Sequence, residues 1–330
     1  MQSFDTLSVP GILSAIRAGD RVVLSRAITL IESTFPEHRG KAIALLEACL
    51  PFAGNSFRIG ITGSPGAGKS TFIEAFGKHL VEQGRKLAVL AVDPSSRMTR
   101  GSILGDKTRM QQLSREPSVF IRPTASGEHT GGVALATRET ILLLEAAGFD
   151  TILVETVGVG QSEMAVYDIT DLFILLLIPG AGDELQGIKR GIMEMADIIL
   201  INKADGSNME KARLAKAEVE RAVHLFQSKP SGWPTRVTAI SSIEGSGVAD
   251  VWQMVMQYFS ALEASGYLTE NRKAQHSKWF AEELNAALLR YVRTHPAYAA
   301  MFHRFETGIR TGELLPPAAV RRLLTEILPS

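Results

Sequence analysis

The chain has 330 residues, with 35 Lys and Arg against 35 Asp and Glu, and 45% of its residues are hydrophobic. The zero net charge argues against a protein that binds nucleic acid, because such binding needs an excess of cations facing the phosphates. Cys49 is the only cysteine, so the chain can form neither an internal disulfide nor a cysteine-based zinc site. No apolar run approaches the ~20 residues that span a bilayer. We therefore expect a cytoplasmic protein without a membrane segment.

Residues 1–56 are predicted to be helical. Apolar side chains recur there at three- and four-residue spacings, as in Leu24, Ala27 and Ile28. Pro36 interrupts the pattern before a second apolar stretch. We expect a helical N-terminal extension.

From residue 57 the pattern changes to short apolar runs that alternate with longer helical segments. Several runs are apolar on both faces, as in parallel strands that helices cover on each side. The predicted strands are residues 57–62, 87–92, 119–122, 151–154, 172–178, 198–201 and 236–240. The predicted helices between them are residues 69–83, 133–147, 187–195, 209–226 and 248–262. This alternation predicts an α/β fold with a doubly wound, mainly parallel sheet that binds ligands at the carboxyl ends of its strands.

After about residue 265 the pattern predicts no further strand. It predicts two amphipathic helices, at residues 279–292 and 317–328, separated by a polar gap. The chain is therefore expected to have three parts. They are a helical N-terminal extension (1–56), a nucleotide-binding domain (57–262) and a helical C-terminal arm (263–330).

The octet after the first predicted strand matches the phosphate-loop pattern G-x-x-x-x-G-K-[ST], in the strand–loop–helix context that this pattern requires. Its residues are Gly63, Ser64, Pro65, Gly66, Ala67, Gly68, Lys69 and Ser70, with Thr71 following in the helix. Glycines let the backbone N–H groups wrap a phosphate. The Lys69 ammonium would bind the β- and γ-phosphates, and the Ser70 hydroxyl would bind Mg²⁺. The octet predicts a nucleoside-triphosphate site.

The base is indicated by Asn202-Lys203-Ala204-Asp205, directly after the predicted strand 198–201. The Asp205 carboxylate can accept hydrogen bonds from the ring N–H and the amino group of guanine, whereas adenine would leave it unpaired. We expect Asn202 to fix this loop and Lys203 to cover the base. A second loop, Ser241-Ser242-Ile243, would complete the base pocket with backbone N–H groups. The predicted ligand is GTP.

Two carboxylates end strands close to this phosphate loop in the predicted sheet. Asp93 follows the strand 87–92, and Glu155 follows the strand 151–154. Both suit Mg²⁺, which prefers a few carboxylates together with phosphates. Gly158 could give its backbone N–H to the γ-phosphate and so couple a loop to the presence of that phosphate. Asp93, Glu155 and Gly158 therefore predict a switch, that is, loops whose conformation depends on whether the γ-phosphate is present.

The motifs together carry a specific resemblance to the MeaB/ArgK/MMAA family of P-loop GTPases, which belong to the SIMIBI class. The segments that carry it are V-D-P-S-S (92–96), G-S-I-L-G-D-K-T-R-M (101–110), E-T-V-G-V-G-Q-S-E (155–163), P-G-A-G-D-E-L-Q-G-I-K (179–189) and N-K-A-D (202–205). The resemblance covers nearly the whole chain. It places the chain in the branch that has a glutamate, here Glu155, where most GTPases have the aspartate of D-x-x-G.

The resemblance implies a GTP-hydrolysing metallochaperone for an adenosylcobalamin-dependent acyl-CoA mutase. Members gate cofactor loading and protect or reactivate the mutase, and they are homodimers formed through the C-terminal arm. The implied client is a methylmalonyl-CoA, isobutyryl-CoA or 2-hydroxyisobutyryl-CoA mutase. The adenosyltransferase that supplies the cofactor is a further partner to consider. Neither a nucleic acid nor a membrane is implied.

The resemblance also assigns roles to residues of the switch loops. Asp106 lies in switch I and is expected near Mg²⁺, and Glu155 lies in switch II. Asp183, Gln186 and Lys189 lie in a third switch. We expect Gln186 and Lys189 to reach the nucleotide pocket only when the mutase contacts this loop. Because no glutamine directly follows Gly158, a water-positioning residue is not assured. We therefore expect slow hydrolysis by the protein alone and faster hydrolysis with its partner.

Three other functions remain open at this point. One is a P-loop kinase, the activity that the name ArgK preserves. Another is a nickel-delivering GTPase of the same branch, which the single cysteine and the scattered histidines disfavour. The third is a module that holds GTP as a static ligand. The sequence also lacks the D-x-H-x-x-G stretch of cobalamin domains, so the partner is expected to supply the cobalamin site.

Overall fold

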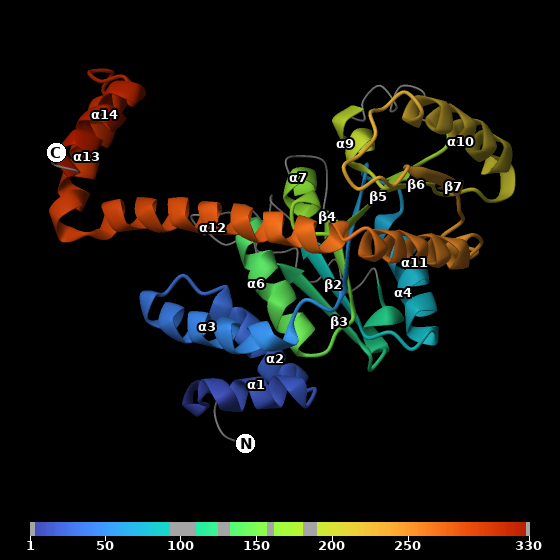
Figure 1. Cartoon of the computed structure of the whole chain (residues 1–330), viewed down its shortest axis with the longest axis horizontal. Helices are drawn as coiled ribbons and strands as arrows, with labels where there is room; N and C mark the ends of the chain where they lie inside the picture. The colour runs from blue at the N-terminus through green and yellow to red at the C-terminus, as the bar shows by residue number, and fades with distance from the viewer. Residues whose placement is uncertain (1–3, 93–109, 125–132, 157–161, 181–189, 328–330) are drawn as a thin grey trace. The chain divides into compact units, whose positions relative to one another are not determined.

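The computed structural model describes residues 4–92, 110–124, 133–156, 162–180 and 190–327 (Figure 1). Contacts between residues divide the chain into two compact units, residues 1–275 and 276–330. The division falls within one long helix, α12 (Tyr267–Thr294). The finer division that the sequence predicts, with boundaries after residues 56 and 262, stays a prediction. Within the described residues, no helix is both long enough and apolar enough to cross a membrane.

The first unit contains a seven-stranded sheet in the order β3-β2-β4-β1-β5-β6-β7, and every neighbouring pair of strands is parallel. The strands are β1 (Phe57–Gly63), β2 (Leu87–Val92), β3 (Val119–Thr124), β4 (Thr151–Thr156), β5 (Leu172–Leu177), β6 (Ile198–Ile201) and β7 (Arg236–Ala239). They match the predicted runs to within two residues at each end. The predicted α/β fold with a doubly wound sheet is confirmed.

The apolar runs form strands here because helices cover the sheet on both sides. Every residue of β2, β4 and β5 is buried. Alternate residues of β5 serve different cores: Ile174 packs with α4 (Lys69–Glu82) and α11 (Val248–Ala264), whereas Leu175 packs with α9 (Arg190–Met195) and α10 (Met209–Val223). This arrangement follows from the period-2 geometry of a strand.

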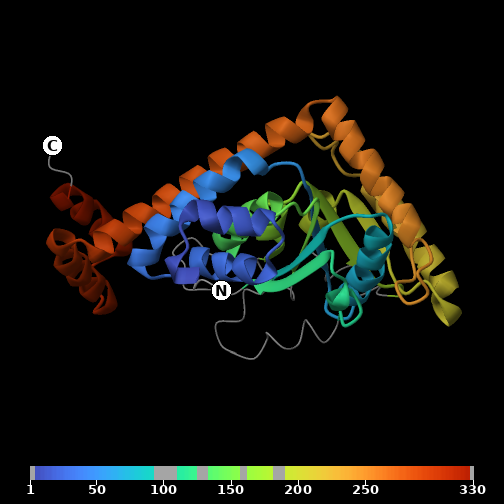
Figure 2. The same ribbon diagram turned by 90° about the horizontal axis from the view of Figure 1, so that it is seen from below.

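The N-terminal segment forms three helices, α1 (Val9–Arg17), α2 (Arg21–Ile31) and α3 (Pro36–Cys49). The Asp20 side chain caps α2 by accepting hydrogen bonds from the Val22 and Val23 N–H groups, both at 2.9 Å. All three helices pack against α6 (Val133–Ala146) (Figures 1 and 2). The predicted helical extension is therefore present and belongs to the first unit.

The end of the chain contains one more helix than the sequence predicted. α13 (Pro296–Arg310) lies between α12 and α14 (Pro316–Ile327), where a polar gap was expected, so this prediction was wrong. Pro296 suits the first turn of a helix, and the His295 ring caps it by accepting the Ala297 N–H. α13 then packs against α14 and buries Phe305. The exposed charges on its other face conceal this apolar side in the sequence.

Candidate functional site

The predicted phosphate loop joins β1 to α4 at the carboxyl edge of the sheet. Gly63, at the end of β1, has φ 151°, and a Cβ there would lie 2.5 Å from the Leu176 carbonyl oxygen of the neighbouring strand. Gly68 has φ 85° and caps α4, and a Cβ there would lie 2.6 Å from the Asn202 side-chain nitrogen. The loop therefore needs glycine at both positions, for conformation and for space.

Two polar groups of this loop are suited to phosphate oxygens. Lys69 is buried, and its Nζ donates to the carbonyl oxygens of Gly63 at 2.7 Å and Ser64 at 3.3 Å. The Ser64 hydroxyl oxygen is covered from solvent and makes no hydrogen bond within the described residues. Both lie beside the N-terminus of α4, where backbone N–H groups and the helix dipole favour an anion.

The predicted Mg²⁺ ligands Ser70 and Glu155 are in direct contact. The Ser70 hydroxyl donates a hydrogen bond of 3.2 Å to Glu155 Oε1, and Glu155 is only 4% exposed. A hydroxyl and a buried carboxylate beside the phosphate loop form an oxygen donor set that fits Mg²⁺. The other two predicted ligands, Asp93 and Asp106, lie outside the described residues.

The structure also shows a contact between two residues for which the sequence predicted no role. Thr62 on β1 and Thr156 on β4 are buried, and their hydroxyl oxygens are 2.9 Å apart. Thr62 precedes Gly63 of the phosphate loop, and Thr156 follows Glu155. The pair thus joins the two strands that carry the phosphate loop and the predicted Mg²⁺ carboxylate. No local motif marks this contact, because it depends on the order of strands in the sheet.

The predicted guanine loop contacts the phosphate loop through Asn202. This residue is 1% exposed, and its side-chain nitrogen donates to the Ala67 carbonyl oxygen at 2.8 Å. Its side-chain oxygen accepts hydrogen bonds from the Ser242 backbone N–H at 3.2 Å and from the Ser242 hydroxyl at 2.8 Å. Asn202 therefore joins three loops that lie far apart in the sequence.

Asp205 is oriented by the second loop. The Ser241 hydroxyl donates a 2.6 Å hydrogen bond to Asp205 Oδ2, and the other carboxylate oxygen has no hydrogen-bond partner among the described residues. Lys203 has φ 60°, the one non-glycine residue with positive φ in the described part of the chain. Ile243 is 78% exposed, so its side chain does not contribute to the core. The positive φ of Lys203 strains the backbone, and strained backbone is typical of ligand sites.

Three further predicted site residues, Gly158, Gln186 and Lys189, lie outside the described residues. The residues of the phosphate loop and of the two guanine loops lie together at the carboxyl edges of β1, β6 and β7. Chemically, this edge offers an ammonium and backbone N–H groups suited to phosphate oxygens, and a carboxylate able to accept hydrogen bonds from two N–H donors.

Known proteins resemble this chain over most of its length. The family model described as "Methylmalonyl Co-A mutase-associated GTPase MeaB" matches residues 24–297. A probable GTPase of Mycobacterium tuberculosis is 48% identical over 98% of this chain and 96% of its own length. GTPase ArgK of Escherichia coli is 44% identical over 93% of both chains.

Two other relatives widen the comparison. The mitochondrial methylmalonic aciduria type A homolog of Mus musculus is 45% identical over 93% of this chain and 76% of its own length. A crystal structure described as LAO/AO transport system kinase has a TM-score of 0.75 and 37% identity, and it covers 99% of both chains. The likeness in sequence and in fold therefore extends over nearly all of the chain.

Proposed function

The chain belongs to the family of methylmalonyl-CoA mutase-associated GTPases called MeaB, and we propose that it uses GTP to control the cobalamin cofactor of an acyl-CoA mutase. In this proposal it acts in the cytoplasm as a metallochaperone. GTP binding and hydrolysis gate the loading of adenosylcobalamin and protect or reactivate the mutase. The client is a methylmalonyl-CoA, isobutyryl-CoA or 2-hydroxyisobutyryl-CoA mutase.

The observation that carries the nucleotide part of the proposal is the contact between Asn202 and Ala67. It holds the base-reading loop against the phosphate loop, so that one nucleotide can occupy both. In the proposed complex the backbone N–H groups of residues 63–71 and the Lys69 ammonium bind the phosphates. Asp205 reads the guanine N–H groups, while Lys203 and the loop 241–243 enclose the base.

Mg²⁺ would be held by the Ser70 hydroxyl and by Glu155, directly or through water, with Asp93 and Asp106 as further proposed ligands. When bound, the ion neutralises charge that develops on the phosphates during hydrolysis. Glu155 is already oriented by Ser70. Gly158, Gln186 and Lys189 are proposed switch residues, and we expect the last two to reach the nucleotide when the mutase binds.

The partner part of the proposal is supported by the names of relatives. The matching family model is described as mutase-associated, and one relative is a methylmalonic aciduria type A homolog. We propose the mutase as the main partner, a homodimer as the working form, and the adenosyltransferase as a further partner. The cobalamin site is then the mutase's own.

A kinase is the second candidate, because the structure with a TM-score of 0.75 is described as a transport system kinase. The phosphate loop alone serves either activity. The two differ in the fate of the γ-phosphate. Incubation with γ-labelled GTP and candidate acceptors separates them, since label on an acceptor supports a kinase and free phosphate supports hydrolysis.

The decisive experiment measures GTP hydrolysis by the full chain with and without each candidate mutase. We expect slow release of phosphate by the protein alone and an increase with its client. The Lys69→Ala variant, which lacks the phosphate-binding ammonium, is the control and should be inactive in both conditions. Fast hydrolysis without a partner, or no response to any of the three mutases, would contradict the proposed chaperone role.

A further inference from the structure

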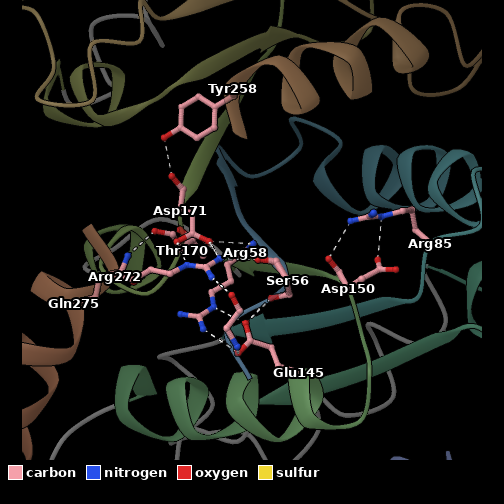
Figure 3. Close-up of polar contacts among 11 residues, drawn as sticks. Ser56, Arg58, Arg85, Glu145, Asp150, Thr170, Asp171, Tyr258, Arg272 and Gln275 are labelled. Carbon is pink, nitrogen blue, oxygen red and sulfur yellow. Dashed lines mark hydrogen bonds and ion pairs between the residues drawn. The ribbon is translucent and has the colours of Figure 1, made fainter. Parts of the chain in front are cut away.

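A second set of polar contacts lies at the opposite, amino edge of the sheet (Figure 3). We call it the amino-edge cluster and define it as Ser56, Arg58, Glu145, Asp171 and Arg272. Its Arg–carboxylate pairs are largely buried: the side chain of Asp171 is 0% exposed and that of Arg272 is 15% exposed. Buried charges of this kind are costly unless they are paired, so the arrangement is specific.

Arg272, in the second turn of α12, makes hydrogen bonds to three residues. Its guanidinium forms a fork on Asp171, with Nε 3.0 Å from Oδ1 and Nη2 2.7 Å from Oδ2. It also donates to the backbone carbonyl oxygens of Gly54 and Ser56. A planar guanidinium can make all of these bonds at once, whereas a lysine ammonium cannot reproduce the fork.

Neighbouring side chains hold the same short segment of chain. Gln275, one helical turn after Arg272, donates from its side-chain nitrogen to the Thr170 carbonyl oxygen at 2.8 Å. Tyr258 on α11 donates to the Asp171 carbonyl oxygen at 2.7 Å. Residues 170 and 171 are therefore held by α11 and α12 as well as by the sheet.

Residues 170 and 171 follow the helix that comes after the predicted switch II. α7 (Ser162–Tyr167) comes after Glu155, Thr156 and the predicted switch glycine in the chain. The Thr170 hydroxyl donates to the Val166 carbonyl oxygen at 2.8 Å, which joins Thr170 to α7. α7 also lies tightly on β1, because a Cβ at Gly60 would come 2.8 Å from Thr170 Oγ1 and 3.0 Å from Val166.

We propose that Arg272 is a positioning residue for GTP hydrolysis, acting through Asp171 and α7 on Glu155 of the predicted switch II. The fork holds Asp171, next to Thr170, which is bonded to α7, while the Thr62–Thr156 pair holds the strand that carries Glu155. α7 packs against β4, so holding α7 limits the positions that Glu155, on β4, can take relative to the nucleotide. The inference rests on the proposed hydrolysis of GTP and adds to it a residue on the opposite edge of the sheet.

The test compares Arg272→Lys with Arg85→Lys in the full-length protein. Arg85 is a matched control, because its Nε lies 3.0 Å from Asp150 Oδ1 at the same edge, but this pair does not contact α7 or α12 (Figure 3). We expect kcat to fall about tenfold in Arg272→Lys, with the KM for GTP and the affinity for GDP unchanged. Arg85→Lys should keep the wild-type kcat. Asp171→Asn, which alters the fork from its other side, should reproduce the effect of Arg272→Lys.

A second measurement detects the position of α7 directly. Hydrogen exchange of the amides of residues 163–171 should be faster in Arg272→Lys than in wild type, and unchanged in Arg85→Lys. Equal kcat in the two lysine variants, or a loss of GTP affinity that accounts for the lower rate, would overturn the inference. If the wild-type protein hydrolyses no GTP, the proposed function fails. Hydrogen exchange then decides the positioning role, and unchanged exchange in Arg272→Lys overturns it.

Discussion

Asp205 shows how much of the site depends on the orientation of one side chain. Its carboxylate is held by the Ser241 hydroxyl at 2.6 Å, and its loop is tied to the phosphate loop through Asn202. A carboxylate offers only acceptors, so it suits the two N–H donors of guanine. An asparagine amide offers one acceptor and one donor, which matches xanthine, where a carbonyl replaces the amino group.

We therefore predict that Asp205→Asn exchanges the base preference of the protein. Affinity for GTP should fall about 100-fold, because the amide N–H then faces the guanine amino group. Affinity for xanthosine triphosphate should rise. Competition binding with both nucleotides measures this. Asp250→Asn, which removes the same charge from an exposed position on α11, should change neither affinity; a retained preference for GTP in Asp205→Asn would exclude Asp205 from the base site.

At the scale of the element, the link between α6 and β1 stabilises the first unit. Glu145 on α6 accepts two hydrogen bonds from the Arg58 guanidinium, at 2.8 and 2.9 Å. It also accepts the Ser56 hydroxyl at 2.6 Å and the Gly54 N–H at 2.7 Å. Burial by itself would raise the pKa of Glu145, but the charge of Arg58 and these hydrogen bonds outweigh burial and lower that pKa.

This lowered pKa predicts how stability depends on pH. A carboxyl group whose pKa is lower in the folded state stabilises that state fully at pH values above its pKa in the unfolded state, near 4.5. It loses this stabilising effect as the pH falls through its pKa in the folded state. Glu145→Gln should therefore lower the free energy of unfolding by about 3 kcal/mol at pH 7. The difference from wild type should shrink as the pH falls below 4.5.

Urea unfolding at a series of pH values measures this difference. The control is Glu270→Gln, because Glu270 pairs with Lys273 on the exposed surface of α12, with side chains 70% and 69% exposed. Exposed pairs contribute little, so this variant should resemble wild type at every pH. A loss of stability in Glu145→Gln that stays constant with pH would show that its charge is not the cause.

Elements and motifs differ in how well the sequence predicts them. The strands were predictable because burial on both faces leaves continuous apolar runs, as in Leu172–Leu177. The phosphate loop was predictable because its residues are contiguous. α13 was missed because its apolar side is narrow and lies among exposed charges. The Arg272–Asp171 fork joins residues 101 positions apart, and no local pattern pairs an arginine with a distant aspartate.

At the scale of the whole chain, the first unit uses the two edges of one sheet for different purposes. The carboxyl edge carries the loops around Lys69, Asn202 and Asp205. The amino edge carries the buried ion pairs of Arg58 and Arg272. A parallel sheet makes this separation possible, because all its strands begin at one edge and end at the other. Catalytic loops can then vary while the opposite edge keeps the strands and helices in place.

The second unit has a feature that a single copy does not explain. Four large side chains of α12 are exposed at spacings of four, four and three residues, which places them on one face of the helix. They are Phe280 at 70%, Leu284 at 44%, Leu288 at 54% and Tyr291 at 51% exposed. Contiguous apolar surface of this kind marks an interface more often than a solvated face. The proposed homodimer would cover it.

We predict that Leu288→Asp converts the protein from a dimer to a monomer. A carboxylate on this face would have to lose its water in the interface without a partner, which costs several kcal/mol for each copy. Analytical ultracentrifugation of the full chain measures the mass. Asn285→Asp, an exposed position on the same helix but off this face, should leave the dimer intact.

Because α12 also carries Arg272, GTP hydrolysis should be measured on the same samples. A monomeric Leu288→Asp variant with unchanged kcat would show that hydrolysis does not need the dimer, whereas a dimeric variant would remove this face from the interface.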